Sequence, residues 1–507
     1  MTEASCMNPT DLLLPPASRL VHIGPHKTGT TSVQHAFHVN REELRRHRVH
    51  YTGPSEQPLL AALAVAGGGG MKGDRPPRPE DWTELVDEVR AAGDQRVVVS
   101  SEFLCYADDA AARRVVTEIP GGPVHVVVTL RSVAKIAPSQ WQQYVQNGLR
   151  VPYTEWLDGM FRRPPYDQPT PSFWRRHAHG ELVRRWAEAV GPENLTVVVA
   201  DESDPAMLLR TFEAFVGLPQ GVLELGDNAA NRSLARGEIE LVRFLNESFY
   251  KHGWAEPWTA EAHARIVRRG VVRQMKTGRR PAADEARLVM PDWAVERAAE
   301  ADARTVESIK ASGVRVIGNL DSLAQVSAPK GGEDAGGPVL IPADAAALAV
   351  LGAMSAGSKP GEGTRFAAAM AVLAATSGAK PRFDSAGIPL LPAGAAARAA
   401  LGVIEARAAR EVFMRLPKIP SDTGALALFG AARGGRGKPT NVAALAGARP
   451  LLDALGVRQP GSEKPAQPKV APPATIDDEV IRKASTPDLL KVVAIRVRRR
   501  VERRLKR

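Results

Sequence analysis

The sequence predicts an α/β protein in which helices cover both faces of a parallel sheet, followed by a C-terminal extension of different character. Short apolar runs alternate with segments of helical spacing through about the first 320 residues, a pattern typical of parallel sheets. The runs are continuous and rich in Val, which indicates strands buried on both faces. All eight Trp and all six Tyr lie at or before Trp293, and the chain then becomes rich in Ala, Gly and Pro.

The expected elements follow from these apolar runs and from apolar residues spaced three or four apart. The strands lie at residues 19–24, 96–100, 124–130, 195–200 and 313–318. The helices lie at residues 28–40, 80–92, 110–117, 133–146, 207–216, 238–249 and 293–311. Only Pro25, His26 and Lys27 lie between the first strand, which ends at Gly24, and the first helix, so together they form a strand–loop–helix unit.

The composition divides the chain into four parts. These are a loose leader at 1–18, an α/β domain at 19–325, an Ala-rich extension at 326–475 and a basic amphipathic helix at 476–507. In the extension, Ala-rich stretches at 344–354, 366–376 and 395–409 favour helix but contain few large apolar residues. Short helices of that kind bury little surface, so a helical and a disordered extension both remain open.

The positive charge of the chain is concentrated at its C-terminus. Residues 487–507 contain nine Lys or Arg and two acidic residues, and so carry seven of the chain's net eleven positive charges. The high isoelectric point therefore describes this tail rather than the α/β domain, and no specific nucleic-acid partner is expected. Two interpretations of the tail stay open: a solvated helix that packs its apolar stripe on the body, or a contact with an anionic membrane or acidic polymer.

The cysteines and the N-terminus bear on location. Cys6 and Cys105 are the only two cysteines, which is no disulfide framework and fits a reducing cytosol. No signal peptide is visible, and no window approaches the roughly 18 apolar residues of a membrane span. We expect a cytoplasmic protein, with the basic helix as a means of peripheral contact with the inner face of the membrane. The Ala- and Arg-rich composition is typical of a bacterium with a GC-rich genome.

The most informative segment is Gly-Pro-His-Lys-Thr-Gly-Thr-Thr-Ser at residues 24–32. It lies between an expected buried strand and a helix, where free backbone N–H groups at the helix start can surround an anion. Gly29 allows close approach of the backbone, and Lys27 adds a mobile positive charge. The hydroxyl groups that can donate hydrogen bonds to an oxyanion belong to Thr28, Thr30, Thr31 and Ser32.

This segment is not a Walker A loop, because a Walker A Lys directly follows the second glycine, whereas Lys27 precedes Gly29. It resembles the 5′-phosphosulfate loop of the sulfotransferase family, whose members use 3′-phosphoadenosine 5′-phosphosulfate (PAPS) as donor. The resemblance covers about residues 19–320 and is closest to carbohydrate-type and bacterial members. It implies a P-loop-like sheet, and it implies that residues 27–32 bind the phosphosulfate.

A second motif supports this resemblance. The family holds the donor's 3′-phosphate with an Arg at the end of a strand and a Ser eight positions later, and this chain has Arg131 and Ser139. An Arg at that end of a strand reaches the crevice where open α/β sheets bind ligands, and its planar fork suits phosphate. The segment Asn-Arg-Ser-Leu at 231–234 resembles a family segment near the nucleotide, which would make Arg232 a further ligand. The alternative for that segment is a helix N-cap by Ser233.

Sulfuryl transfer to a hydroxyl needs a base for the acceptor proton and positive charge near the leaving phosphate oxygen. Lys27 suits the second role. Glu102 is the expected base, because it follows the strand at 96–100 and should lie at the same sheet edge as the loop and Arg131. Its alternative roles are to cap the next helix or to pair with Arg131. His26 is the competing base, whereas His22 and His125 lie within strands and are expected in the core.

The sequence thus predicts a sulfotransferase that moves a sulfuryl group from PAPS to a hydroxyl acceptor by in-line displacement. The acceptor could be a carbohydrate, a glycolipid or a small molecule. No metal site is expected, because two distant Cys and scattered His do not form a ligand cluster. Two other interpretations remain: a Mg-ATP-dependent kinase or NTPase, and a non-catalytic binding or scaffold protein with a vestigial loop.

Overall fold

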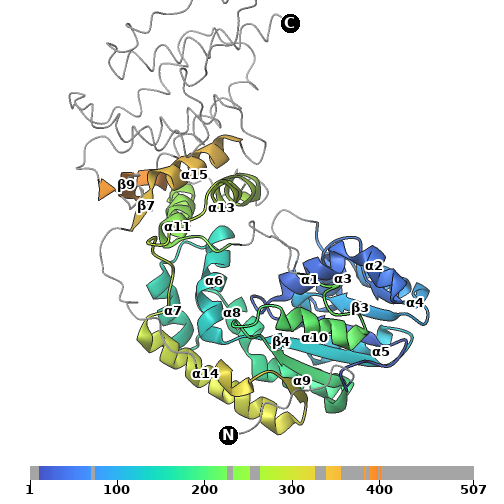
Figure 1. Ribbon diagram of the computed structural model, residues 1–507. Coiled ribbons are helices and arrows are strands. Elements are labelled where there is room, and N and C mark those ends of the chain that lie inside the picture. The colour runs from blue at the N-terminus through green and yellow to red at the C-terminus, as the bar shows by residue number, and fades with distance from the viewer. Residues whose placement is uncertain are drawn as a thin grey trace, which may run out of the picture.

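The computed structural model describes residues 11–69, 75–224, 232–251, 263–325 and 339–355, with the short stretches 382–383, 389–393, 395–397 and residue 400. In these residues a twisted sheet with helices on both faces lies beside a second group made almost entirely of helices (Figure 1).

The main sheet has six strands and is parallel throughout. Their order across the sheet is β2-β3-β1-β4-β5-β6. The strands are β1 (Arg19–Ile23), β2 (Val49–Tyr51), β3 (Arg96–Ser100), β4 (Val124–Leu130), β5 (Leu195–Val199) and β6 (Arg315–Ile317). All five strands expected from the apolar runs are confirmed. β2 was not expected, because three residues with a central His give no apolar run.

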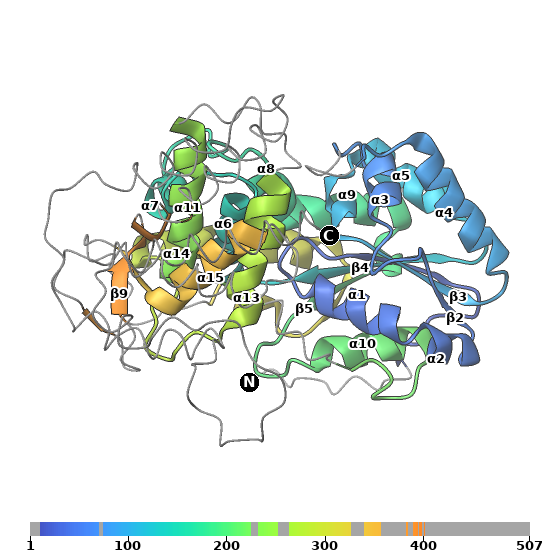
Figure 2. The same cartoon turned by 90° about the horizontal axis from the view of Figure 1, so that it is seen from above.

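Successive residues of the strands face two separate cores, as the pleat requires. Val97 and Val99 face one core, and Val98 between them faces the other. The first core is covered by α3 (Leu59–Val65), α4 (Pro79–Ala91), α5 (Asp109–Glu118) and α9 (His179–Val190). The second is covered by α1 (Thr30–Val39), α2 (Arg41–Arg46) and α10 (Met207–Val216). Figure 2 shows these two layers on opposite sides of the strands, so the fold is α/β as predicted.

The second group of helices shares a core of its own. It contains α6 (Val133–Gln146), α7 (Tyr153–Phe161), α8 (Ser172–His177), α11 (Arg236–Lys251), the π-helix η5 (Ala264–Val272), α13 (Arg273–Gly278), α14 (Asp292–Ser312) and α15 (Ala343–Ser355). A small antiparallel sheet of β7 (Leu340–Pro342), β9 (Pro389–Pro392) and β8 (Arg382–Phe383) lies beside it. Short 3-10 turns complete the description: η2 (Glu102–Tyr106), η3 (Pro192–Asn194) and η6 (Leu320–Leu323).

The end of the N-terminal leader is packed rather than loose. Leu12 and Leu14 are buried in the same core as α10, and the backbone N–H of Leu14 donates a hydrogen bond of 3.0 Å to the carbonyl of Phe215. Two apolar side chains at alternate positions are enough to attach this segment to the helix layer. The expectation of a loose leader is therefore wrong for residues 11–18, and residues 1–10 lie outside the described chain.

Part of the expected extension packs against the α/β domain. The Ala-rich stretch 344–354 forms α15, whose residues from Ala343 to Ala353 are buried against η5 and α13. Ion pairs add to this apolar contact: Nε of Arg279 lies 2.9 Å from Asp344 of α15, and its Nη1 lies 3.0 Å from Glu238. The expected helices at 366–376 and 476–507 lie outside the described residues. None of the helices in the described ranges combines the length and apolar character that a membrane crossing requires.

Gly352 is the point at which α15 comes closest to η5, and it supplies a test of this packing. A Cβ at Gly352 would lie 2.5 Å from the carbonyl oxygen of Gly270 and 2.7 Å from Cα of Val271. We expect Gly352→Ala to lower the free energy of unfolding by about 1–3 kcal/mol, because backbone atoms must move apart. The gain in helix propensity offsets this by at most about 1 kcal/mol. Urea denaturation followed by Trp fluorescence measures the change.

The matched control is Gly69→Ala, where an added Cβ has no atom within 4 Å. This variant should unfold like the wild type. Equal stability of Gly352→Ala and the control would mean that α15 does not press against η5 in solution.

Candidate functional site

The residues expected to act together lie at the carboxyl ends of three neighbouring strands. The loop with Lys27 follows β1, Glu102 follows β3, and Arg131 follows β4. In the sheet order, the connection after β1 runs toward β2 and the connection after the adjacent β4 runs toward β5, so these two connections run in opposite directions. Open α/β sheets bind their ligands at such a point of reversal, outside the carboxyl ends of the strands.

The loop between β1 and α1 has a backbone shape that depends on glycine. Gly29 has φ 96° at the start of α1, and Lys27 adopts the left-handed conformation with φ 71°. A Cβ at Gly24 would collide with the hydroxyl of Thr30, which packs against the turn. Thr31 and Ser32, in the first turn of α1, are exposed. The first N–H groups of this helix have no acceptor within it, so the turn can bind an oxyanion.

A buried chain of polar side chains fixes the loop to the sheet. His22 on β1 has Nδ1 2.8 Å from the hydroxyl of Ser100 on β3, and Nε2 3.2 Å from that of Thr129 on β4. The hydroxyl of Thr129 is 3.0 Å from that of Thr28, which donates a hydrogen bond of 2.8 Å to the carbonyl of Pro25. The Thr28 hydroxyl is therefore committed to the loop, and Thr28 can serve a ligand through its backbone N–H.

Burial keeps the histidines of the sheet neutral. It lowers the pKa of His22 to about 3 and that of His125 to about 4, with the charge of Arg315 contributing at His125. Both rings are buried within strands, so their assignment to the core is confirmed. His125 Nε2 lies 2.9 Å from the hydroxyl of Thr196.

Lys27 is a half-buried cation without a counter-ion. It forms no salt bridge with any residue in the described part of the chain. Burial lowers its pKa to about 8, and the positive charges of Lys276 and Arg176 act in the same direction while Glu102 opposes them. Positive groups from three different elements therefore lie around the loop, and an anion bound there would relieve their repulsion.

Two amide side chains hold the carboxylate of Glu102. Nε2 of Gln34 on α1 donates to one oxygen at 3.0 Å, and Nε2 of Gln57 donates to the other at 3.1 Å. The hydroxyl of Ser101 in turn donates to Gln57 at 2.8 Å. Neutral amides orient the carboxylate without cancelling its charge. Sequence reasoning missed both glutamines, although a Gln on the apolar face of α1 is a polar residue in need of a partner.

His26 lies in an apolar environment beside the loop. Its ring packs on Phe103 at 5.1 Å and near Tyr106 at 6.1 Å, measured between ring centres. Its buried Nε2 has no hydrogen-bond partner among the described residues. Burial lowers the pKa of His26 well below its ordinary value, and the charges of Arg176 and Lys27 lower it further. An imidazole that resists protonation in this way is a weak base.

Arg131 is paired with a carboxylate from the neighbouring strand connection. Its Nε donates to Oε1 of Glu202 at 2.8 Å, and Lys135 lies 3.0 Å from the other oxygen of Glu202. The hydroxyl of Ser139 donates to the carbonyl of Ile136 at 3.0 Å, inside its own helix. Both predicted phosphate ligands are therefore engaged within the protein. A phosphate would have to replace Glu202 at Arg131.

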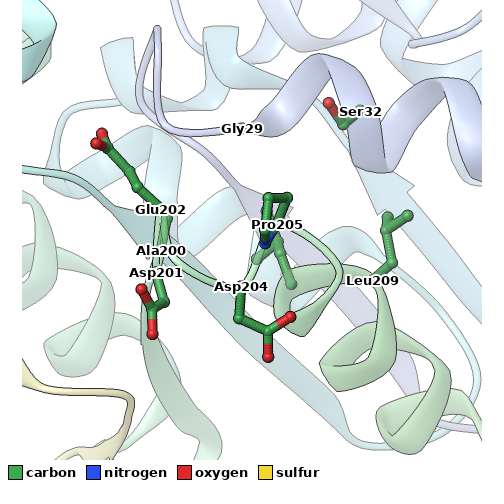
Figure 3. A pocket seen from close by; sticks show the side chains of 9 residues that line it. Gly29, Ser32, Ala200, Asp201, Glu202, Asp204, Pro205 and Leu209 are labelled. Carbon is green, nitrogen blue, oxygen red and sulfur yellow. The ribbon is translucent and has the colours of Figure 1, made fainter. Parts of the chain in front are cut away.

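A pocket of about 280 Å³ opens between the first turn of α1 and the segment that follows β5 (Figure 3). It is lined by Gly29, Ser32, Ala200, Asp201, Glu202, Asp204, Pro205, Leu208 and Leu209. The Glu202 side chain extends away from those of Asp201 and Asp204 (Figure 3). Each carboxylate has a partner: Glu202 pairs with Arg131, Asp204 with Arg210, and Asp201 accepts hydrogen bonds from Ser203.

Arg232 lies in a structural ion-pair network. Its guanidinium binds both carboxylate oxygens of the fully buried Glu238, at 2.8 and 2.9 Å, and donates to the carbonyl of Met275 at 2.7 Å. Glu238 also pairs with Arg279. These contacts occupy the hydrogen-bond donors of Arg232, so a nucleotide would have to replace some of them. The role of Arg232 as a nucleotide ligand stays a prediction. Asn231 lies outside the described residues.

Comparison of the chain with protein-family models, with curated proteins and with solved structures finds no match. The link to the sulfotransferases therefore rests on the residues of the loop and of the Arg131 motif. Within the residues that the structure describes, no three His, Cys, Asp or Glu side chains are grouped so that they could hold a metal ion.

Asp302 on α14 anchors the turn that carries Arg131. One of its oxygens accepts hydrogen bonds of 2.9 Å from the hydroxyl of Ser132 and from the N–H of Val133. The other oxygen is buried without a partner in the described chain. Burial raises the pKa of Asp302 to about 7, against the opposing effect of these two hydrogen bonds.

The folded protein therefore binds a proton at Asp302 between about pH 4 and pH 7 that the unfolded chain has already lost. The contribution of this group to stability falls as the pH rises through that window, by about 1.4 kcal/mol for each unit between the two pKa values. We expect Asp302→Asn to lose less stability than the wild type between pH 5 and pH 8 in urea titrations. The exposed Glu296→Gln on the same helix should keep the wild-type difference, and an unchanged slope in Asp302→Asn would contradict the assignment.

Proposed function

We propose that this chain is a sulfotransferase that moves a sulfuryl group from PAPS to a hydroxyl acceptor. The observation that carries the proposal is the meeting, at one edge of the sheet, of an anion-binding loop with Lys27 and of Arg131 on the adjacent strand. PAPS carries negative charge at two separate positions, the 5′-phosphosulfate and the 3′-phosphate. Two basic groups on neighbouring strand ends match that arrangement.

In the proposed complex, the N–H groups at residues 28–32 and the Lys27 ammonium surround the 5′-phosphosulfate. Because the pKa of Lys27 is about 8, most of it is protonated at neutral pH, and a bound anion would raise that fraction. Arg131 exchanges Glu202 for the 3′-phosphate, and Ser139 adds a donor from the next helix. The pocket beside Gly29 would receive the adenosine, with Leu208 and Leu209 against the base.

The proposed reaction is an in-line displacement at sulfur. The acceptor oxygen forms a bond to sulfur as the bond between sulfur and the bridging phosphate oxygen breaks. Glu102 takes the proton of the acceptor hydroxyl, and Lys27 stabilises the negative charge that develops on the leaving phosphate. The products are a sulfate ester and adenosine 3′,5′-bisphosphate. Glu102 is favoured over His26 as the base because its carboxylate is oriented by two amides, whereas burial makes His26 hard to protonate.

A Mg-ATP-dependent kinase or NTPase is a second candidate for one specific reason. Three carboxylates line the pocket beside the loop; they are not grouped as a metal site by themselves, but one or two carboxylates together with the phosphates of ATP are enough to hold Mg²⁺. Two observations favour PAPS instead. The carboxylates Glu202 and Asp204 are already paired with arginines, and Lys27 precedes the second glycine of the loop, unlike the Lys of an ATP-binding Walker A loop.

Binding of adenosine 3′,5′-bisphosphate to the full chain tests the donor site. Calorimetry should give metal-independent binding that is tighter than binding of Mg-ATP. Arg131→Ala should weaken it by about 10- to 100-fold, because charge-assisted hydrogen bonds to phosphate are lost. Glu202→Gln should strengthen it a few-fold, because the competing carboxylate is removed. Arg184→Ala, an arginine paired with Glu181 and Glu188 on the surface of α9, is the control. A preference for Mg-ATP would favour the kinase, and no binding of either nucleotide would favour a scaffold.

Glu102→Gln tests the base. The amide retains the shape of the side chain but cannot take a proton, so turnover should fall by about 10²- to 10⁴-fold while affinity for the bisphosphate is kept. Release of the bisphosphate from PAPS, measured with a panel of hydroxyl acceptors, gives the rate. His26→Gln is the companion variant: a collapse there, with normal turnover in Glu102→Gln, would assign the base to His26.

A further inference from the structure

A second basic group beside the loop has no role in the donor site described above. Arg176, in α8, lies between two tyrosine rings, with its guanidinium carbon 5.3 Å from the ring centre of Tyr106 and 5.5 Å from that of Tyr144. Its Nε donates to the hydroxyl of Tyr106. The hydroxyl of Tyr144 lies 3.0 Å from that of Ser172 at the start of α8. The rings and these contacts hold the guanidinium in a fixed place.

The site of Arg176 adjoins Lys27 and Glu102. Tyr106 is the last residue of η2, which begins at Glu102 and packs against α8. The ring of Tyr106 also lies 6.1 Å from that of His26, the neighbour of Lys27 in the loop. Electrostatics agrees with this position, because the charge of Arg176 adds to burial in lowering the pKa of both Lys27 and His26.

Arg176 lacks a counter-ion in the described part of the chain. It forms no salt bridge there, and its two terminal nitrogens make no hydrogen bond with the described residues. By contrast, Arg185 on α9 has a carboxylate 3.2 Å away in Asp109. A half-buried guanidinium next to a second cation is unfavourable unless an anion joins them. The free edge of Arg176 is a planar fork of donors suited to a carboxylate, sulfate or phosphate group.

The direction of the site separates it from the donor. Arg131 follows β4 and the pocket beside Gly29 adjoins the segment after β5, whereas η2, whose Tyr106 contacts Arg176, follows β3 and begins at Glu102. Figure 1 shows α8 near the centre of the molecule, between α6 and the sheet. The acceptor must approach from the side of the base that takes its proton. We therefore propose that Arg176, with Tyr106 and Tyr144, binds an anionic group of the acceptor, so that the substrate class is a hydroxyl compound that also carries a carboxylate, sulfate or phosphate.

This inference rests on the proposed function, and its test is chosen so that the two can fail separately. The probes are methyl β-glucuronide and methyl β-glucoside, which share their ring and ring hydroxyls and differ in a carboxylate. Saturation-transfer NMR on the full chain, with and without adenosine 3′,5′-bisphosphate, measures their affinities. The wild type should bind the glucuronide at least about tenfold more tightly, as expected for a charge-assisted pair, and inorganic sulfate should compete with it.

Arg176→Gln should abolish the preference for the glucuronide, and Arg176→Lys should retain part of it because charge remains without the fork. The control is Arg175→Gln, an exposed arginine whose guanidinium carbon is also 5.1 Å from the Tyr106 ring, and it should bind like the wild type. Calorimetry with the bisphosphate should give unchanged affinity in Arg176→Gln.

Equal binding of the two sugars by the wild type, including no binding of either, overturns the inference. The inference is also overturned if Arg175→Gln loses the preference for the glucuronide as fully as Arg176→Gln does. Weaker bisphosphate binding in Arg176→Gln would overturn it as well, because Arg176 would then belong to the donor site. Absence of bisphosphate binding in the wild type would instead remove the proposed function. The preference for the glucuronide can still be measured in that case, because sugar binding is also measured without the bisphosphate.

Discussion

The arrangement of the site depends on one buried chain of hydrogen bonds that runs across three strands. His22 stands at its centre, and it joins Ser100 on β3 to Thr129 on β4 and, through Thr129, to Thr28 in the loop. Burial keeps the ring neutral, so it can bond to a hydroxyl on each side. Because Ser100 is two residues before Glu102 and Thr129 two before Arg131, the same hydrogen bonds position the loop, the proposed base and the proposed phosphate-binding arginine relative to one another.

The basic groups around the loop fall into two kinds. Arg131 has an internal carboxylate partner in Glu202, so a ligand there must replace an existing ion pair. Lys27 and Arg176 have no such partner among the described residues, so a ligand there would meet two cations that repel each other and that have no carboxylate partner. Binding at the first kind of group exchanges one anion for another, so the ion pair with Glu202 competes with the ligand. Binding at the second kind has no such competitor and relieves the repulsion between the cations.

Sequence reasoning found the features that are local in the chain. The Val-rich strands, the glycine turn and the amphipathic helices α1, α6, α10 and α14 all follow from patterns within about twenty residues. The partners of the site were not accessible in this way, because Gln57, Glu202 and Arg176 reach it from distant segments. α9 was missed although its face is strongly amphipathic. Arg232 matched a motif, yet its side chain bonds to Glu238, which no spacing rule reveals.

The ion pairs around Glu238 extend the folded body beyond the boundary that composition indicates at residue 325. Arg232 and Arg279 share this buried carboxylate, and Arg279 also binds Asp344 on α15. Arg232 reaches the backbone of α13 as well, at Met275 and Lys276, and Lys276 is one of the cations that act on Lys27. A protein shortened to residue 325 would lose Asp344, one of the three carboxylates that pair with Arg279, and would uncover the apolar side of η5. Expression of the α/β part without the rest of the chain should therefore include residues at least through Ser355.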